Sequence, residues 1–172
     1  FPTRRSSDLL GAGKTTLLRR LVRAPGGRRL AFVVNEFSAV DVDAALVERE
    51  GGTALAVAGG SIFCRCLVTE FVTVLRRVAD GMPDRDGALC QPEGVVIEAS
   101  GVADPRSLRR LLDESGLSAR FHVAGVTAVV DPGTLAKLLL VLPNIRGQVE
   151  CADLILVNKA DLHAPEGVAK LC

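Results

Sequence analysis

A glycine-rich run near the start of the chain, GAGKTT at residues 11–16, has the residue types that bind phosphate. Glycines allow backbone N–H groups to turn inward around phosphate oxygens, and a lysine directly after them can reach the β- and γ-phosphates. The hydroxyl that follows the lysine can bind Mg²⁺, and a helix that starts there adds the positive end of its dipole. The run therefore predicts a nucleotide site. The residues predicted to bind the nucleotide here are Gly11, Ala12, Gly13, Lys14, Thr15 and Thr16.

The residues before this run depart from the pattern of a phosphate-binding loop. The full pattern is G-x-x-x-x-G-K-[ST], and its first position is occupied by Asp8, whose carboxylate would meet the phosphates unfavourably. A buried strand should lead into the loop, yet residues 1–8 read FPTRRSSD, a polar segment that contains proline. We therefore expect residues 1–8 to be a non-native leader, with a divergent natural N-terminus as the alternative.

A second run, NKAD at residues 158–161, follows an apolar segment and has the residue types that recognise guanine. The carboxylate of Asp161 can accept hydrogen bonds from both N1 and N2 of guanine, a pair of donors that adenine lacks. Asn158 and Lys159 are expected to brace the loop and to cover the base. The alternative is an ordinary polar strand end. The position of this run downstream of GAGKTT favours a GTP site.

Acidic residues after other apolar runs can complete the nucleotide site. Glu98 follows GVVI and can hold the Mg²⁺ shell, while Gly101 can approach the γ-phosphate as part of a switch. Asp43 lies behind the segment NEF, where a first switch loop is expected. For Glu98 the alternative is a solvated strand terminus. The predicted catalytic residues are Lys14, Thr15 and Glu98, and the predicted Mg²⁺ ligands are Thr15, Asp43 and Glu98.

The elements that must position these residues alternate between strands and helices. Nearly continuous apolar runs are typical of parallel strands that are covered on both faces, and ligands of such sheets bind at the carboxyl ends of the strands. This alternation predicts an α/β sandwich with a mostly parallel sheet flanked by helices and with a loop over residues 80–93. Strands are expected at 30–34, 53–59, 94–100, 123–131 and 153–158, and helices at 14–23, 69–79, 105–114 and 133–142.

The runs GAGKTT, VVNEF, VVIEASGVADP, VTAVVD and LVNKADL resemble, in order and spacing, those of the CobW-type GTPases, a metal-handling family of the SIMIBI class of P-loop NTPases. The resemblance implies a P-loop NTPase domain over residues 9–172, incomplete because it lacks its first strand and its C-terminal elements, with the C-terminal domain of the family absent. It also implies hydrolysis of GTP with Mg²⁺, coupled to delivery of a metal ion, zinc or cobalt, to a client metalloprotein.

The cysteines nearest to these motifs match the family only in part. The family usually carries G-C-x-C-C, whereas this chain reads GSIFCRC at residues 60–66, which leaves Cys64 and Cys66. Two thiolates can bind Zn²⁺ or another soft transition metal but cannot close a four-ligand site. Glu36 or a residue of the client is expected to complete it. The alternative is that both cysteines are simply small residues of a loop.

The composition argues against some classes of binding partner but does not decide between the possible activities. A net charge of +1 and an aromatic content of 3% argue against nucleic acid and membrane as partners, and five cysteines without a secretory signal indicate a cytoplasmic protein. An alternative to a GTPase is a module that binds nucleotide or metal without turnover. An inactive fragment is the third hypothesis, and homodimerisation stays open.

Overall fold

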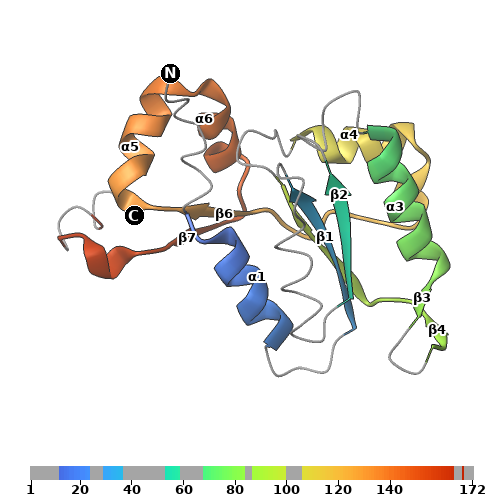
Figure 1. The fold of residues 1–172 in the computed structure, drawn as a ribbon. Coiled ribbons are helices and arrows are strands. Elements are labelled where there is room, and N and C mark those ends of the chain that lie inside the picture. Colours follow the sequence, from blue (N-terminus) through green and yellow to red (C-terminus); the bar gives the residue numbers. More distant parts are fainter. Residues whose placement is uncertain are drawn as a thin grey trace, which may run out of the picture. The chain divides into compact units, whose positions relative to one another are not determined.

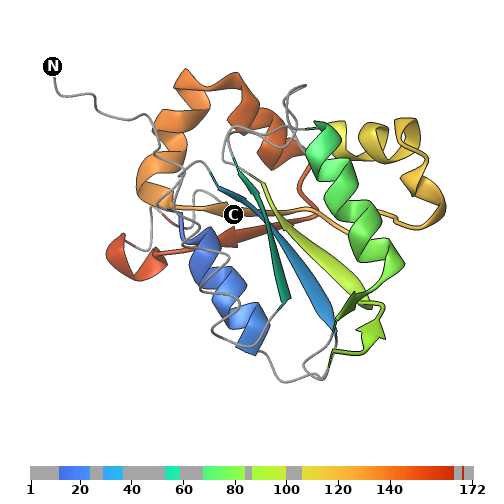
Figure 2. The same cartoon turned by 45° about the vertical axis from the view of Figure 1, so that its right-hand side comes forward.

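The computed structural model describes residues 12–23, 29–36, 53–58, 68–83, 87–99, 106–164 and 168. They belong to two compact units, one formed by residues 15–122 and the other by the chain up to Lys14 and from Val123 onward. Figures 1 and 2 show the elements of each unit from two directions. None of the helices in the described ranges is both long enough and apolar enough to cross a lipid bilayer.

The unit of residues 15–122 contains a three-stranded parallel sheet with the strand order β2-β1-β5. Strand β1 (Leu30–Glu36) is hydrogen-bonded to both β2 (Thr53–Ala58) and β5 (Gly94–Glu98), as Figure 1 shows. Because the three strands run in one direction, their carboxyl ends lie at one edge of the sheet. The α/β class with a parallel sheet that the sequence predicts is confirmed here. The other elements that pack in this unit are α1 (Lys14–Arg23), α3 (Val68–Asp80), α4 (Arg106–Glu114) and the 3₁₀ turn η1 (Leu117–Ala119).

Helices cover both faces of this sheet, which explains why its strands read as continuous apolar runs. Alternate residues of a strand point to opposite faces. On one face, Phe32 of β1 packs with Leu18 of α1, and both side chains are buried. On the other face, Ala31 of β1 packs with Val78 of α3, which is also buried. The sheet therefore has an apolar layer on each side, and Figure 2 shows α1 and α3 on opposite sides of it.

The region expected to be a loop, residues 80–93, instead contains a short antiparallel hairpin. Its strands are β3 (Met82–Pro83) and β4 (Leu89–Cys90). The side-chain amide of Gln91 donates a hydrogen bond of 3.2 Å to the carbonyl oxygen of Ala79, which ties the hairpin to the last turn of α3. The expectation of a plain loop was wrong because this tertiary bond cannot be seen in a local composition of Gly, Pro and Asp.

The other unit contains a pair of parallel strands, β6 (Thr127–Val130) and β7 (Leu154–Val157). The register pairs Val130 with Val157 at the carboxyl ends of the two strands. The residues that follow these two positions therefore leave the sheet side by side. The remaining elements of this unit are α5 (Pro132–Val141), α6 (Pro143–Glu150) and the 3₁₀ turn η2 (Ala160–Leu162).

The first of these strands is shorter than the strand expected over residues 123–131. The backbone N–H of Val126 donates to the carboxylate of Asp153 at 2.7 Å, and the backbone N–H of Asp153 donates to the carbonyl of Val126 at 2.8 Å. This side-chain bond replaces a ladder bond at the entrance to the pair, so that regular strand structure begins at Thr127.

The sequence predicts one helix after β6, at 133–142, whereas the structure contains two. Pro143 lacks the backbone N–H that would continue α5, but its fixed φ suits the first position of α6. Ile145 of α6 is buried and packs in one cluster with Leu135 of α5 and Val130 of β6. Burial of this apolar residue stabilises a helix of only eight residues that its own propensity would leave marginal.

Candidate functional site

The last residues of the glycine-rich run turn sharply into α1. Gly13 has a φ of 94°, a conformation that favours glycine, and α1 begins at the next residue, Lys14. A Cβ atom at position 13 would overlap the side-chain amide of Asn158. Ala12 is almost completely buried. Both the backbone conformation and the close approach of Asn158 therefore require glycine at this position.

Asn158 joins this run to the NKAD run. Its side-chain Nδ2 donates a hydrogen bond of 2.8 Å to the carbonyl oxygen of Ala12. Its backbone N–H donates to the carbonyl oxygen of Val130 at 2.8 Å, which fixes the residue to the end of β6. The bond to Ala12 connects the two segments that the sequence assigns to phosphate and to base.

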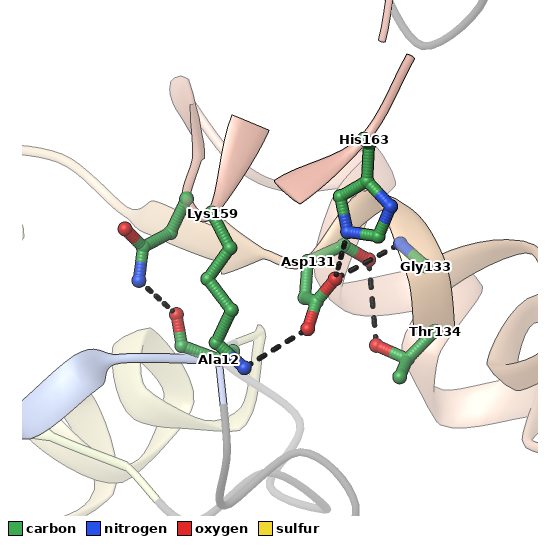
Figure 3. Close-up of polar contacts among 7 residues, drawn as sticks. Ala12, Asp131, Gly133, Thr134, Lys159 and His163 are labelled. Carbon is green, nitrogen blue, oxygen red and sulfur yellow. Dashed lines mark hydrogen bonds and ion pairs between the residues drawn. The ribbon is translucent and has the colours of Figure 1, made fainter. Parts of the chain in front are cut away.

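Asp131, directly after β6, lies at the centre of a cluster of polar contacts (Figure 3). Its Oδ2 is 3.0 Å from Nζ of Lys159, and its Oδ1 is 3.2 Å from Nε2 of His163. Oδ1 also accepts the backbone N–H of Gly133 at 2.9 Å and so caps α5. A Cβ atom on Gly133 would come within 2.5 Å of the ring of His163, so the missing side chain makes room for the imidazole.

The environment of Asp131 favours its ionised form. Its side chain is only 11% exposed, and this burial by itself raises the pKa of the carboxyl group. The hydrogen bonds from Lys159, Gly133 and His163 and the charge of Lys159 outweigh burial, and the pKa lies below its ordinary value. Asp131 is therefore a carboxylate at neutral pH and can hold two cationic or donating side chains at once.

Asp161 lies in the short turn η2, between Lys159 and His163 in sequence. Its side chain is exposed, which leaves both carboxylate oxygens accessible to a ligand. Lys159 precedes the turn with a φ of 57°, in the left-handed region that side chains other than glycine rarely adopt. The NKAD run thus presents one accessible carboxylate on a turn with a defined backbone conformation.

Glu98 ends β5 in the other unit, and its side chain is partly buried. Its Oε2 is a buried carboxylate oxygen at the carboxyl end of a parallel strand. Mg²⁺ prefers hard oxygen ligands of this kind, so the donor chemistry at Glu98 fits the ion. Thr16, the last residue of the glycine-rich run, is exposed on α1.

The structure brings together some of the residues that the sequence predicts for the site. Ala12, Gly13 and Lys14 belong to the same unit as the NKAD run, and Asn158 contacts the first two directly. Glu98 belongs to the other unit. The predicted residues that lie outside the described ones are Gly11, Asp43, Cys64, Cys66 and Gly101, together with the side chains of Thr15 and Glu36.

The part of the chain that the structure describes contains no evident cluster of metal-binding side chains. There, no three side chains of His, Cys, Asp or Glu form a group that could hold a metal ion. Cys90 and Cys151 are free thiols with partial exposure.

Sequence reasoning missed Asp131 and its contact with His163. The available signal was the run Asp131-Pro132-Gly133, since a carboxylate followed by proline is typical of a helix start. That signal predicts a cap and says nothing about Lys159 or His163. Their contacts depend on the pairing of β6 with β7, which places the two strand ends next to each other.

A family model described as "CobW/HypB/UreG, nucleotide-binding domain" matches residues 7–171. The zinc chaperone YjiA of Escherichia coli is 32% identical over 157 residues, which cover 91% of this chain and 48% of YjiA. Zinc-regulated GTPase metalloprotein activator 1 of Schizosaccharomyces pombe is 28% identical over 172 residues, which cover 95% of this chain and 40% of that protein.

A solved structure has a similar fold. The Zn(II)-bound structure of a triple mutant of the YjiA GTPase matches with a TM-score of 0.62 and 25% identity. The match covers 94% of this chain and 50% of that one. The chain thus spans no more than about half the length of these relatives.

Proposed function

Because the chain belongs to the CobW/HypB/UreG nucleotide-binding domain family, we propose that it binds and hydrolyses GTP and couples this cycle to delivery of zinc to a client metalloprotein. The family match confirms the resemblance to CobW-type GTPases, and the solved YjiA structure confirms the P-loop NTPase fold. The names of two relatives, a zinc chaperone and a zinc-regulated GTPase metalloprotein activator, support the metal half of the proposal.

The hydrogen bond from Asn158 to the carbonyl of Ala12 is the observation that carries the nucleotide half. A phosphate loop and a base loop act on one nucleotide only if they are held at a fixed separation. A direct bond of 2.8 Å between the two runs supplies that constraint. The geometry supports a single ligand that carries phosphate at one end and a base at the other.

Guanine is the base that the NKAD run fits. Asp161 is exposed on η2 and offers two acceptor oxygens, which match the N1–H and N2–H donors of guanine. Adenine presents an acceptor at N1 and no amine at C2, so the same carboxylate would face it without a hydrogen bond and with its charge unpaired. This difference predicts a preference for GTP over ATP.

In this proposal, residues of the first turn of α1 and of the end of β5 bind the phosphates and support hydrolysis. Backbone N–H groups around Gly13 would cradle the phosphates, and the ammonium group of Lys14 would neutralise charge on the β- and γ-phosphates. Thr15 and Glu98 would hold Mg²⁺, with Asp43 as a further ligand. Bound Mg²⁺ supplies charge neutralisation at the phosphates. The chain contributes position and charge rather than a covalent group.

Zinc is the cargo in this proposal, and Cys64 and Cys66 are its proposed ligands, with Glu36 as a third. Thiolate sulfur suits Zn²⁺, and an incomplete set of ligands suits a carrier that must release its ion. A titration with Zn²⁺ in the presence of GTP or GDP tests this part. The Cys64→Ser/Cys66→Ser variant should lose binding, whereas the Cys90→Ser/Cys151→Ser variant should bind as the wild type does.

The nucleotide half is tested by competition against a fluorescent GTP analogue with Mg²⁺. We expect GTP to displace the analogue at least about tenfold better than ATP, because each hydrogen bond from guanine to the charged carboxylate is worth about 1.5–3 kcal/mol. Lys14→Ala should weaken both nucleotides alike. Asp161→Asn should weaken GTP and favour xanthosine triphosphate, since xanthine has an oxygen where guanine has its amine. Equal displacement by GTP and ATP in the wild type would refute guanine recognition.

A second candidate function is binding without turnover, which Asp8 favours. This carboxylate occupies the position of the first glycine in a phosphate-loop pattern, where its charge opposes phosphate. The two candidate functions are distinguished by measuring the rate of phosphate release from GTP in the wild type and in Asp8→Gly. A large gain in hydrolysis for Asp8→Gly excludes the module without turnover, and saturable GTP binding with no hydrolysis in either protein supports it.

A further inference from the structure

Asp131 contacts the residues on both sides of the turn that carries Asp161. Its Oδ2 holds the ammonium group of Lys159 at 3.0 Å, and its Oδ1 holds Nε2 of His163 at 3.2 Å. Lys159 directly precedes η2 and His163 directly follows it. Figure 3 shows the two side chains reaching the same carboxylate from separate directions. One largely covered side chain therefore contacts both ends of the turn.

Within the part of the chain that the structure describes, the turn has few other contacts that keep its shape. It is a single 3₁₀ turn, with hydrogen bonds from Leu162 N to Lys159 O at 3.0 Å and from His163 N to Ala160 O at 3.2 Å. Leu162 is 70% exposed, so it does not anchor the turn in the core. Lys159 also adopts a left-handed backbone conformation. This conformation is unfavourable in free energy for a residue with a side chain, so contacts with surrounding residues must stabilise it.

Asp131 itself is held firmly in place. Its Oδ1 accepts the N–H of Gly133 at the start of α5, and its backbone follows Val130, which is buried. Its own exposure is 11%, whereas Asp161 is exposed. The carboxylate of Asp131 thus connects the end of β6 to the accessible turn after β7.

We propose that Asp131 is a positioning residue for base recognition, which holds Lys159 and His163 so that Asp161 faces the hydrogen-bonding edge of guanine. This inference rests on the proposed function, because it assigns a support to the residue that reads the base. Asp131 does not touch the nucleotide in this arrangement. Its loss should therefore lower discrimination between bases more than it lowers affinity for the phosphates.

Inosine triphosphate is the probe that isolates this effect, because hypoxanthine lacks only the N2 amine of guanine. In the wild type, the ratio of the Kd for inosine triphosphate to the Kd for GTP reports the hydrogen bond between that amine and Asp161. A hydrogen bond to a charged group corresponds to a ratio of about 10 to 100. In Asp131→Asn we expect the ratio to fall at least about threefold, because GTP loses two hydrogen bonds to Asp161 where inosine triphosphate loses one.

Asp153→Asn is the matched control. Asp153 also lies in this unit and its carboxylate also accepts a backbone N–H, that of Val126, but no described contact joins it to the turn at residues 160–162. A general loss of stability would move both variants alike. Only a positioning role lowers the ratio in Asp131→Asn while leaving it unchanged in Asp153→Asn.

If Asp131→Asn does not fold, variants of His163 test the same inference. Glutamine can donate to the carboxylate of Asp131 as the imidazole does, whereas alanine cannot. We expect His163→Gln to retain the ratio of the wild type and His163→Ala to lower it. An unchanged ratio in His163→Ala, or in a folded Asp131→Asn, overturns the inference while leaving the proposed function intact. A wild type that binds both nucleotides equally overturns the proposed guanine recognition, and with it this inference.

Discussion

The side-chain amide of Asn158 donates a hydrogen bond of 2.8 Å to the backbone carbonyl of Ala12, a residue 146 positions earlier in the chain. Through its own backbone N–H, Asn158 is also bonded to Val130. The residue therefore fixes the entry to α1 against the strand end that carries the NKAD run. Its contribution to stability and to ligand binding can be measured separately.

Asn158→Ala should lower the free energy of unfolding by about 1–3 kcal/mol, because the change removes the donor and leaves the buried carbonyl of Ala12 without it. Urea unfolding of the wild type and the variant measures this difference. Lys137→Ala, a change at an exposed residue of α5 in the same unit, is the control and should stay within about 0.5 kcal/mol. Equal midpoints for Asn158→Ala and the wild type would show that the bond is not stabilising.

Gly13→Ala should destabilise the protein more than Gly116→Ala does. Both glycines have positive φ values, 94° and 72°, which cost a residue with a Cβ atom about 1–2 kcal/mol. A Cβ atom at Gly116 meets no atom within 4 Å, whereas one at Gly13 overlaps the amide of Asn158. The difference between the two variants in urea unfolding therefore measures the overlap.

The double variant Gly13→Ala/Asn158→Ala provides the check on this explanation. Because the second change removes the amide that the new Cβ atom meets, the double variant should lose less stability than the sum of the two single variants. Strictly additive losses would mean that the overlap at Asn158 is not the cause and that backbone conformation alone explains the effect of Gly13→Ala.

The fold could be predicted from the sequence wherever a local pattern decides the structure. The run at residues 30–34 is continuously apolar and forms β1, since both faces of that strand are covered. The spacing of residues 71, 74, 75 and 78 predicts one buried helix face in α3. Phe71, Leu75 and Val78 are buried there, whereas Val74 is half-buried. Helix α6 was missed because Ile145 is its only large buried residue, so its pattern is weak without the partner surface of α5.

The candidate site could be predicted only in part for a similar reason. Lys14, Asn158 and Asp161 indicate binding of phosphate and guanine because each of them lies in a short run of residues that together form a known binding pattern. The contacts of Asp131 with Lys159 and His163 depend instead on the register of β6 with β7, which pairs Val130 with Val157. No pattern within either strand encodes that register, so sequence reasoning could not find the cluster.

Leu75→Ala should lower the free energy of unfolding by about 2–5 kcal/mol, because Leu75 is 1% exposed in α3 and its truncation leaves a cavity. Leu140→Ala is the matched control, since Leu140 is 88% exposed in α5 and its change should stay within about 0.5 kcal/mol. Urea unfolding measures both. A similar loss for the two variants would mean that the side chain of Leu140 is covered in solution.

The ionised form of Asp131 should contribute stability that disappears in acid. Its pKa in the folded protein is lowered because hydrogen bonds from Lys159, Gly133 and His163 outweigh the effect of burial. The unfolded chain then binds a proton more readily than the folded protein does, near the ordinary aspartate pKa of about 3.9. The contribution is therefore complete above that value and is lost as the pH falls through the lower pKa of the folded state.

The difference in free energy of unfolding between the wild type and Asp131→Asn should thus stay constant above about pH 5 and shrink below about pH 4. Urea unfolding at a series of pH values from about 6 to 2.5 measures it. Asp113→Asn, a change at an exposed residue of α4, is the control for the general effect of removing one carboxylate. A difference for Asp131→Asn that grows as the pH falls would mean that burial dominates and that the carboxyl group is held in its neutral form.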